Sequence, residues 1–155
     1  MEERKLDERD LQLCTFKIGD NFYAISVFDI QEIIKPQRIT VVPLIDDDVR
    51  GLVNLRGQIV TSISLRNLLG LEDHLTKKFM NVVVRRGDDL FSLVVDDVLD
   101  VVDLEESMFE DTSSVLDEKI RGFIKGVFKL EDRLLIYLDL EVLLETQQVN
   151  RGIDG

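Results

Sequence analysis

The second half of this chain repeats the pattern of the first half. A shift of 68 residues places residues 19–27 on 87–95, and both segments begin with Gly-Asp and continue with apolar residues. A shift of 75 residues places Gly51 on Gly126, and the apolar positions that follow coincide as far as Leu69 and Leu144. An internal repeat of this length predicts that one structural unit is built twice.

Within each copy the apolar residues alternate or form short β-branched runs, which is typical of strands. We expect strands at 11–18, 22–27, 38–42, 58–65, 80–86, 90–95, 99–102, 124–130 and 133–138, and short helical segments at 28–34, 66–71 and 140–147. Strands this short that return on themselves favour small closed barrels, because closure removes exposed edges. The predicted fold is mainly β, with two barrel subdomains related by duplication, short helical turns and a C-terminal helix.

The repeat also predicts the domain organisation. We expect a charged N-terminal tail at 1–10, one domain at 11–146 with two intertwined subdomains at about 11–71 and 79–146, and a C-terminal tail at 147–155. The second copy is longer, and its extra residues fit an enlarged loop at 105–117. A copy of about 70 residues is marginal as an independent domain. The two copies should therefore share an apolar seam and unfold together.

Charge and composition exclude several classes of protein. The formal net charge is −12, with 31 acidic and 19 basic residues, which disfavours binding to nucleic acid or to an anionic membrane surface. No apolar run approaches the roughly 20 residues that span a bilayer, and the charged N-terminus lacks the apolar core of a secretory signal. A single cysteine allows no internal disulfide. We expect a soluble cytoplasmic protein.

The residues that could carry catalysis are few. His74, the single histidine, lies in a polar linker, and Cys14 shares a strand face with apolar neighbours. The carboxylates at 46–48 and 96–103 lack the spacing of a calcium-binding loop. With one histidine and one cysteine the chain has no zinc-ligand set. We therefore expect no enzyme activity, no metal and no cofactor.

One block, at 49–60, is hard to explain as core alone. It reads Val-Arg-Gly-Leu-Val-Asn-Leu-Arg-Gly-Gln-Ile-Val and places Arg56 beside Gly57 at an expected hairpin tip. The second copy has Glu131 and Asp132 at these positions, so the fold accepts other residues there. The simplest interpretation is a solvated turn residue. An arginine on a rigid hairpin with apolar neighbours is, however, a common anchor of protein interfaces.

This block and its flanking segments resemble the CheW family, the coupling proteins of bacterial chemotaxis arrays. The resemblance rests on 22–27, 30–33, 39–43, 49–60 and 65–66, whose order and spacing hold over 11–145. It implies two SH3-like five-stranded β-barrels. It also implies an adaptor that joins the cytoplasmic tips of methyl-accepting chemotaxis receptors to the regulatory domain of the histidine kinase CheA through barrel-to-barrel contacts.

By position, the resemblance implies five partner-binding residues near the groove between the barrels: Ile30, Glu32, Gly51, Asn54 and Arg56. Glu32 is expected on a helical turn. The implied protein is a cytoplasmic monomer outside the array, is recruited to membrane receptor arrays, and is not inserted in the membrane. Two alternatives stay open: a CheW-like scaffold in a chemosensory pathway that controls pili or gene expression, and a small β-barrel that binds nucleic acid.

Overall fold

The computed structural model describes residues 6–41, 49–72, 79–111 and 118–145. The expected C-terminal tail, the aspartates at 46–48 and the linker residue His74 lie outside the described residues. The elements, in chain order, are η1 (Glu8–Asp10), β1 (Gln12–Ile18), β2 (Asn21–Ser26), η2 (Val27–Asp29), β3 (Ile30–Ile34), β4 (Val49–Leu55), β5 (Gln58–Ser64), α1 (Leu65–Leu68), β6 (Met80–Arg86), β7 (Asp89–Val95), β8 (Asp97–Asp103), η3 (Glu106–Met108), β9 (Phe109–Glu110), α2 (Glu118–Arg121), β10 (Ile124–Lys129), β11 (Leu134–Leu138) and α3 (Leu140–Glu145), where η marks a 3-10 turn.

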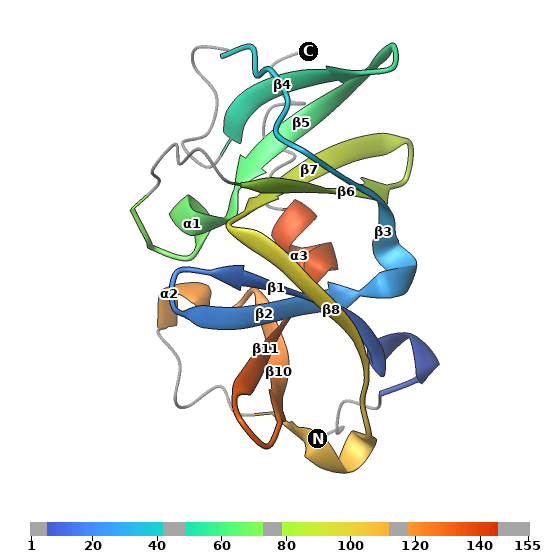
Figure 1. The fold of residues 1–155 in the computed structure, drawn as a ribbon, viewed down its shortest axis with the longest axis vertical. Coiled ribbons are helices and arrows are strands. Elements are labelled where there is room, and N and C mark those ends of the chain that lie inside the picture. The colour runs from blue at the N-terminus through green and yellow to red at the C-terminus, as the bar shows by residue number, and fades with distance from the viewer. Residues whose placement is uncertain (1–5, 42–48, 73–78, 112–117, 146–155) are drawn as a thin grey trace.

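These strands form two sheets, as the mainly β prediction requires (Figure 1). The first sheet has the order β8-β1-β2-β11-β10-β9, and the second has the order β3-β6-β7-β5-β4. The first sheet has six strands rather than the expected five because it includes the two-residue strand β9. Most neighbours are antiparallel, and one parallel pair joins the two repeats within each sheet, β11 with β2 and β5 with β7.

The strand registers reproduce the repeat seen in the sequence. Val60 of β5 pairs with Leu90 of β7, and the equivalent residues of the other sheet, Leu135 and Phe22, pair in the same way. Each sheet therefore combines the first hairpin of one repeat with the later strands of the other repeat. The two copies at about 11–71 and 79–146 are therefore intertwined, because they exchange their first hairpins.

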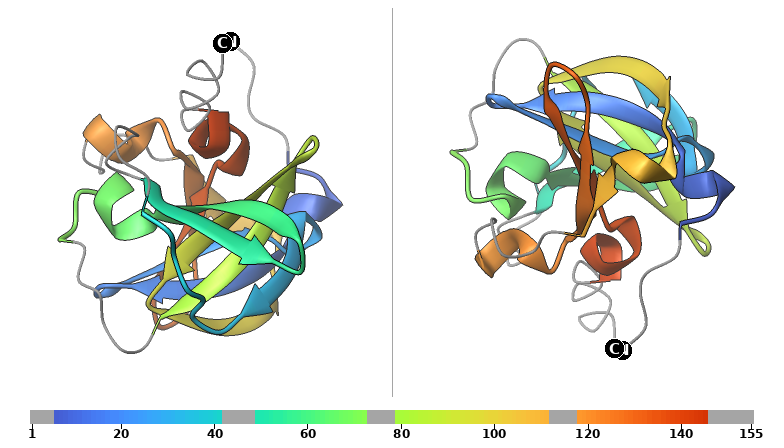
Figure 2. Two further views of the ribbon diagram at one scale, coloured as in Figure 1. Left: turned by 90° about the horizontal axis from the view of Figure 1, so that it is seen from above. Right: turned by 90° about the horizontal axis from the view of Figure 1, so that it is seen from below.

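Three apolar clusters hold this arrangement together. One lies in each sheet, around Leu13 and Phe128 in the first and around Val53 and Val83 in the second. The third and largest lies between the sheets and includes Phe16 of β1 together with residues of β5, β6, β7, β11, α1 and α3. Figure 1 shows the two sheets one above the other with α3 between them, and Figure 2 views the same arrangement from above and from below. The largest core is thus shared by both repeats.

Three local expectations were wrong. Residues 30–34 form β3 rather than a helix, because their β-branched side chains pair with β6, and only the preceding turn Val27–Asp29 is helical. Within the expected strand 38–42, the described residues contribute only a bridge from Thr40 to Leu52. The end of the expected tail 1–10 is part of the fold, because the Tyr137 hydroxyl donates to Asp10 Oδ1 at 2.5 Å.

Candidate functional site

The candidate site begins at the turn between β4 and β5. Arg56 has a φ of 50° and Gly57 a φ of 86°, so both residues of this two-residue turn are left-handed, as in a type I′ hairpin. Glycine adopts such a φ freely, but a residue with a Cβ loses about 1 kcal/mol there. Arginine is therefore a poor choice for the backbone of this turn, and its side chain must account for its presence.

The Arg56 side chain reaches the strand at the opposite edge of the same sheet. Arg56 Nη2 donates to Glu32 Oε2 of β3, and the two side chains are 67% and 26% exposed. In the strand order of the second sheet, β3 and β4 are the two ends. The ion pair therefore spans the seam at which this sheet curls back on itself.

The backbone closes the same seam beside the ion pair. Thr40, beyond the end of β3, exchanges two hydrogen bonds of 2.8 Å with Leu52 of β4. Gly51 makes this approach possible, because a Cβ at that position would lie 2.3 Å from the Thr40 carbonyl oxygen. Its counterpart Gly126 has the same function, since a Cβ there would lie 2.4 Å from Phe109.

The remaining predicted site residues lie around this seam. Asn54 is exposed, and its side-chain oxygen accepts a hydrogen bond of 3.0 Å from the Gly57 amide, which holds the turn. Ile30 is half-buried, pairs with Val84, and packs against the cluster between the sheets. The structure thus brings Glu32, Asn54 and Arg56 together at one end of the second sheet. Ile30 lies farther along β3, and Gly51 acts through the backbone.

Exposed aliphatic side chains flank the site, and the sequence did not single them out. Ile33 on β3 is 40% exposed and Ile59 on β5 is 61% exposed. Their equivalents in the other repeat, Val101 and Leu134, are 52% and 57% exposed. Apolar groups left in water at matching places of both repeats are typical of protein-binding surfaces. The signal that could have found them is the repeat itself.

A second arrangement fastens the two sheets to each other. Arg66 of α1 donates from Nε to Asp96 Oδ1 at 2.9 Å and from Nη2 to Oδ2 at 2.6 Å, and the Gly19 amide donates to the same Oδ2 at 2.8 Å. Burial acts to raise the pKa of Asp96, but these hydrogen bonds outweigh it and hold that pKa below its ordinary value. Neither Arg66 nor Asp96 was predicted to interact.

The described residues offer little for catalysis. Cys14 is 1% exposed, and burial raises the pKa of its thiol, which makes it a poor nucleophile. Within 6–41, 49–72, 79–111 and 118–145, no group of three or more histidine, cysteine or acidic residues is placed to hold a metal ion. None of the helices in these ranges is long and apolar enough to cross a membrane.

The fold and this surface together define a duplicated two-sheet β protein with an exposed, charged seam between the end strands of one sheet. A family model described as the CheW-like domain matches residues 12–148, and the chain belongs to that family.

Individual relatives agree over nearly the whole chain. Chemotaxis protein CheW of Thermotoga maritima is 30% identical over 145 residues, which cover 94% of this chain and 95% of the relative. Chemotaxis protein CheW of Helicobacter pylori is 32% identical over 140 residues, 90% of this chain and 84% of the relative. The crystal structure of scaffolding protein TtCheW from Thermoanaerobacter tengcongensis matches with a TM-score of 0.74 and 25% identity, covering 83% of this chain and 88% of that one.

Proposed function

We propose that this protein is a non-catalytic adaptor of chemotaxis signal transduction that couples methyl-accepting chemotaxis receptors to the regulatory domain of the histidine kinase CheA. Membership of the CheW-like family over residues 12–148 supports this function. The observation that carries it in this chain is the Arg56–Glu32 pair on an exposed seam, next to uncovered aliphatic side chains. The surface has both charge and apolar area for binding another protein.

We assign partner binding to the surface around Glu32, Asn54 and Arg56, with Ile30 extending it along β3. Arg56 is 67% exposed while paired, so a partner carboxylate can share its guanidinium without breaking the fold. Gly51 contributes indirectly, because it lets Thr40 close the seam on which Glu32 and Arg56 meet. An arginine and an acid side by side favour a partner with both charges, which gives specificity despite the net charge of −12.

The protein would act in the cytoplasm, as a monomer until receptor arrays at the membrane recruit it. The excess of 31 acidic over 19 basic residues supports this assignment over nucleic-acid binding, because phosphate contacts require clustered cations.

One comparison favours a second candidate. Protein PilI of Pseudomonas aeruginosa is 28% identical over 123 residues, which cover 79% of this chain and 69% of that protein. A CheW-like scaffold of a chemosensory pathway outside swimming motility would have the same fold and binding surface, and would differ in which receptor it serves.

Reconstitution tests the adaptor function. Receptor cytoplasmic fragments on vesicles are mixed with CheA, with and without this protein, and both co-sedimentation and autophosphorylation of CheA are measured. We expect the protein to sediment with the receptor fragments, to bring CheA with it and to raise kinase activity. Failure to bind either partner in receptor sets from both swimming and pilus pathways would contradict the adaptor function.

A further inference from the structure

The repeat predicts that the contact made by Arg66, Asp96 and Gly19 between the sheets has an equivalent elsewhere in the molecule. We call these two contacts the first and the second joint, and their residues differ. A shift of 68 residues takes Gly19 to Gly87, and a shift of 75 takes Arg66 to Glu141. In the first joint Asp96 accepts the two Arg66 bonds and the Gly19 amide described above, so a carboxylate fills the space between the first hairpin of one repeat and the short helix that follows β5.

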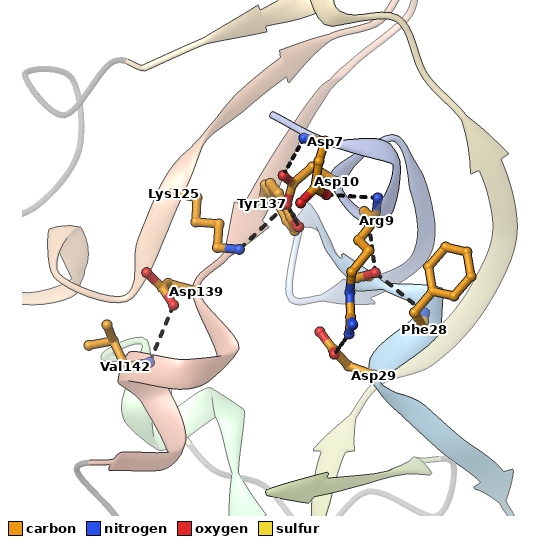
Figure 3. A network of polar contacts seen from close by, with 10 residues as sticks. Asp7, Arg9, Asp10, Phe28, Asp29, Lys125, Tyr137, Asp139 and Val142 are labelled. Carbon is orange, nitrogen blue, oxygen red and sulfur yellow. Dashed lines mark hydrogen bonds and ion pairs between the residues drawn. The ribbon is translucent and has the colours of Figure 1, made fainter. Parts of the chain in front are cut away.

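The second joint lacks this carboxylate. The residue equivalent to Asp96 is Phe28, which is 57% exposed. Figure 3 shows its ring turned away from Lys125 and Tyr137. A cavity of about 380 Å³ lies at this joint, lined by Arg86, Gly87 and Glu141 among others. The joint that Asp96 closes in one half of the molecule is therefore open in the other half.

Arg86 is held loosely at the open joint. Its Nε lies 3.5 Å from Glu141 and its Nη2 lies 3.7 Å from Glu145, and these two carboxylate side chains are 75% and 66% exposed. The Arg86 Nε atom is buried, and it makes no hydrogen bond with any described residue. A buried donor without a hydrogen bond is costly, so a carboxylate that reached it would be bound favourably.

Positive charge is concentrated around this cavity. Its lining includes the cations Arg9, Arg85, Arg86 and Lys125, against two described acids, Asp29 and Glu141. Some of these cations have partners: Arg9 pairs with Asp29 at 2.7 Å, and Lys125 lies 3.5 Å from Asp10. In a chain of net charge −12, a cavity with more cations than anions is a local exception that suits an acidic ligand.

We propose that this cavity, named here the Arg86 cavity, binds the carboxylate of an aspartate or glutamate of a partner protein. In the second joint, the partner's carboxylate would occupy the position equivalent to that of the Asp96 carboxylate in the first joint. The Arg86 guanidinium would be its bidentate hydrogen-bond donor, with the Gly87 amide beside it. The ligand comes from another chain because Phe28 stands at the position equivalent to Asp96, and because Glu141 and Glu145, the acids of this chain that pair with Arg86, stay at 3.5 and 3.7 Å and leave its Nε without a hydrogen bond. The cavity is separate from the Arg56–Glu32 seam, so the proposal stands or falls independently of the adaptor function.

A titration of the ¹⁵N-labelled full chain by nuclear magnetic resonance tests the proposal. The probe is the capped peptide Ac-Ala-Asp-Ala-NH2, and its isosteric control is Ac-Ala-Asn-Ala-NH2. We expect saturable shifts of the Gly87 amide and of the Arg86 Nε–H with the aspartate peptide and none with the asparagine peptide. No shift at these groups, or equal shifts with both peptides, would overturn the proposal.

Variants and a second anion separate a built site from general attraction. Arg86→Gln should weaken peptide binding roughly tenfold. Arg86→Lys, which keeps the positive charge but loses the bidentate guanidinium, should weaken peptide binding less. Arg133→Gln is the matched control, because the Arg133 Nε is also buried without a hydrogen bond but lies outside the cavity lining. Equal losses in Arg86→Gln and Arg133→Gln, or inorganic phosphate binding as tightly as the aspartate peptide, would contradict recognition of a partner's carboxylate.

Discussion

Arg56, in the turn that follows β4, forms an ion pair with Glu32 of β3, and β3 and β4 are the two end strands of one sheet. The pair lies at the surface, with Arg56 67% exposed, and an exposed pair of this kind contributes roughly 0–1 kcal/mol to stability. Two hydrogen bonds between Thr40 and Leu52 close the same seam without it. The ion pair can therefore do little more than offset the conformational cost of about 1 kcal/mol of Arg56 at a φ of 50°, and closure of the seam does not depend on it, which points to a use in binding.

The interlocked repeats predict that neither half folds alone. A fragment of residues 1–75 would contain β1 and β2 without β8 and β11, their neighbours in the first sheet, and would lack most of the cluster between the sheets. We expect no cooperative thermal transition for this fragment by circular dichroism. Mixing it with a fragment of residues 76–155 should restore one. A native-like transition in the isolated fragment would refute the shared core.

Gly51 and Gly126, the two glycines that allow close approaches between strands, predict a matched pair of destabilised variants. Gly51→Ala would place a Cβ 2.3 Å from the Thr40 carbonyl oxygen, and Gly126→Ala would place one 2.4 Å from Phe109. Each should lower the free energy of unfolding by roughly 2–4 kcal/mol, because backbone or ring must shift. Gly122→Ala is the control, since no atom lies within 4 Å of its added Cβ. Urea denaturation measures all three, and equal stability of Gly51→Ala and Gly122→Ala would contradict the close approach.

Asp96 predicts how stability falls in acid. Its pKa is lowered in the folded state because the bonds from Arg66 and the Gly19 amide outweigh burial, which acts to raise it. A lowered pKa stabilises the fold above the ordinary aspartate value of about 4 and loses that contribution as pH falls through the folded pKa. Asp96→Asn should therefore cost roughly 2 kcal/mol near neutral pH and make unfolding less dependent on pH below about 5. An unchanged slope would show that the Arg66 joint contributes little.

The repeat and the strand alternation predicted much of the fold from sequence, including the two β subdomains and the hairpin that carries Arg56. That the subdomains are intertwined was expected, but which hairpins they exchange could not be predicted, because alternation fixes which residues are buried but not which strand lies beside which. The segment 28–34 has only a weak helical period, and this period predicts a short helical piece. Only the pairing of Ile33 and Ile34 with β6 decides for a strand.

The residues of the candidate site were predicted from the sequence, but their geometry was not. The different residue at the equivalent position of the second repeat marked Arg56, and the structure adds its ion pair with Glu32, itself a predicted site residue, and its left-handed backbone. The Arg66–Asp96 joint links residues 30 positions apart, and neither residue carries a local pattern that indicates pairing. The repeat could have found Ile59 and Leu134, since equivalent positions share exposure.

Binding by Arg56 variants tests the central claim most directly, that this chain is an adaptor with a binding surface at the Arg56–Glu32 seam. The affinities of Arg56→Ala and Arg56→Glu for a receptor cytoplasmic fragment and for the CheA regulatory domain are measured separately by calorimetry, and each variant is also melted. Glu32→Ala extends the test to the partner of the pair. Glu131→Ala is the control, because it changes the equivalent position of the second repeat.

We expect Arg56→Ala to lose roughly 2 kcal/mol of binding to at least one partner, more than tenfold in affinity, and Arg56→Glu to lose more. Its free energy of unfolding should change by less than about 0.5 kcal/mol, while Glu131→Ala affects neither binding nor folding to this extent. Unchanged affinity of both Arg56 variants for both partners, or a loss of binding that only follows a loss of stability, would contradict the account.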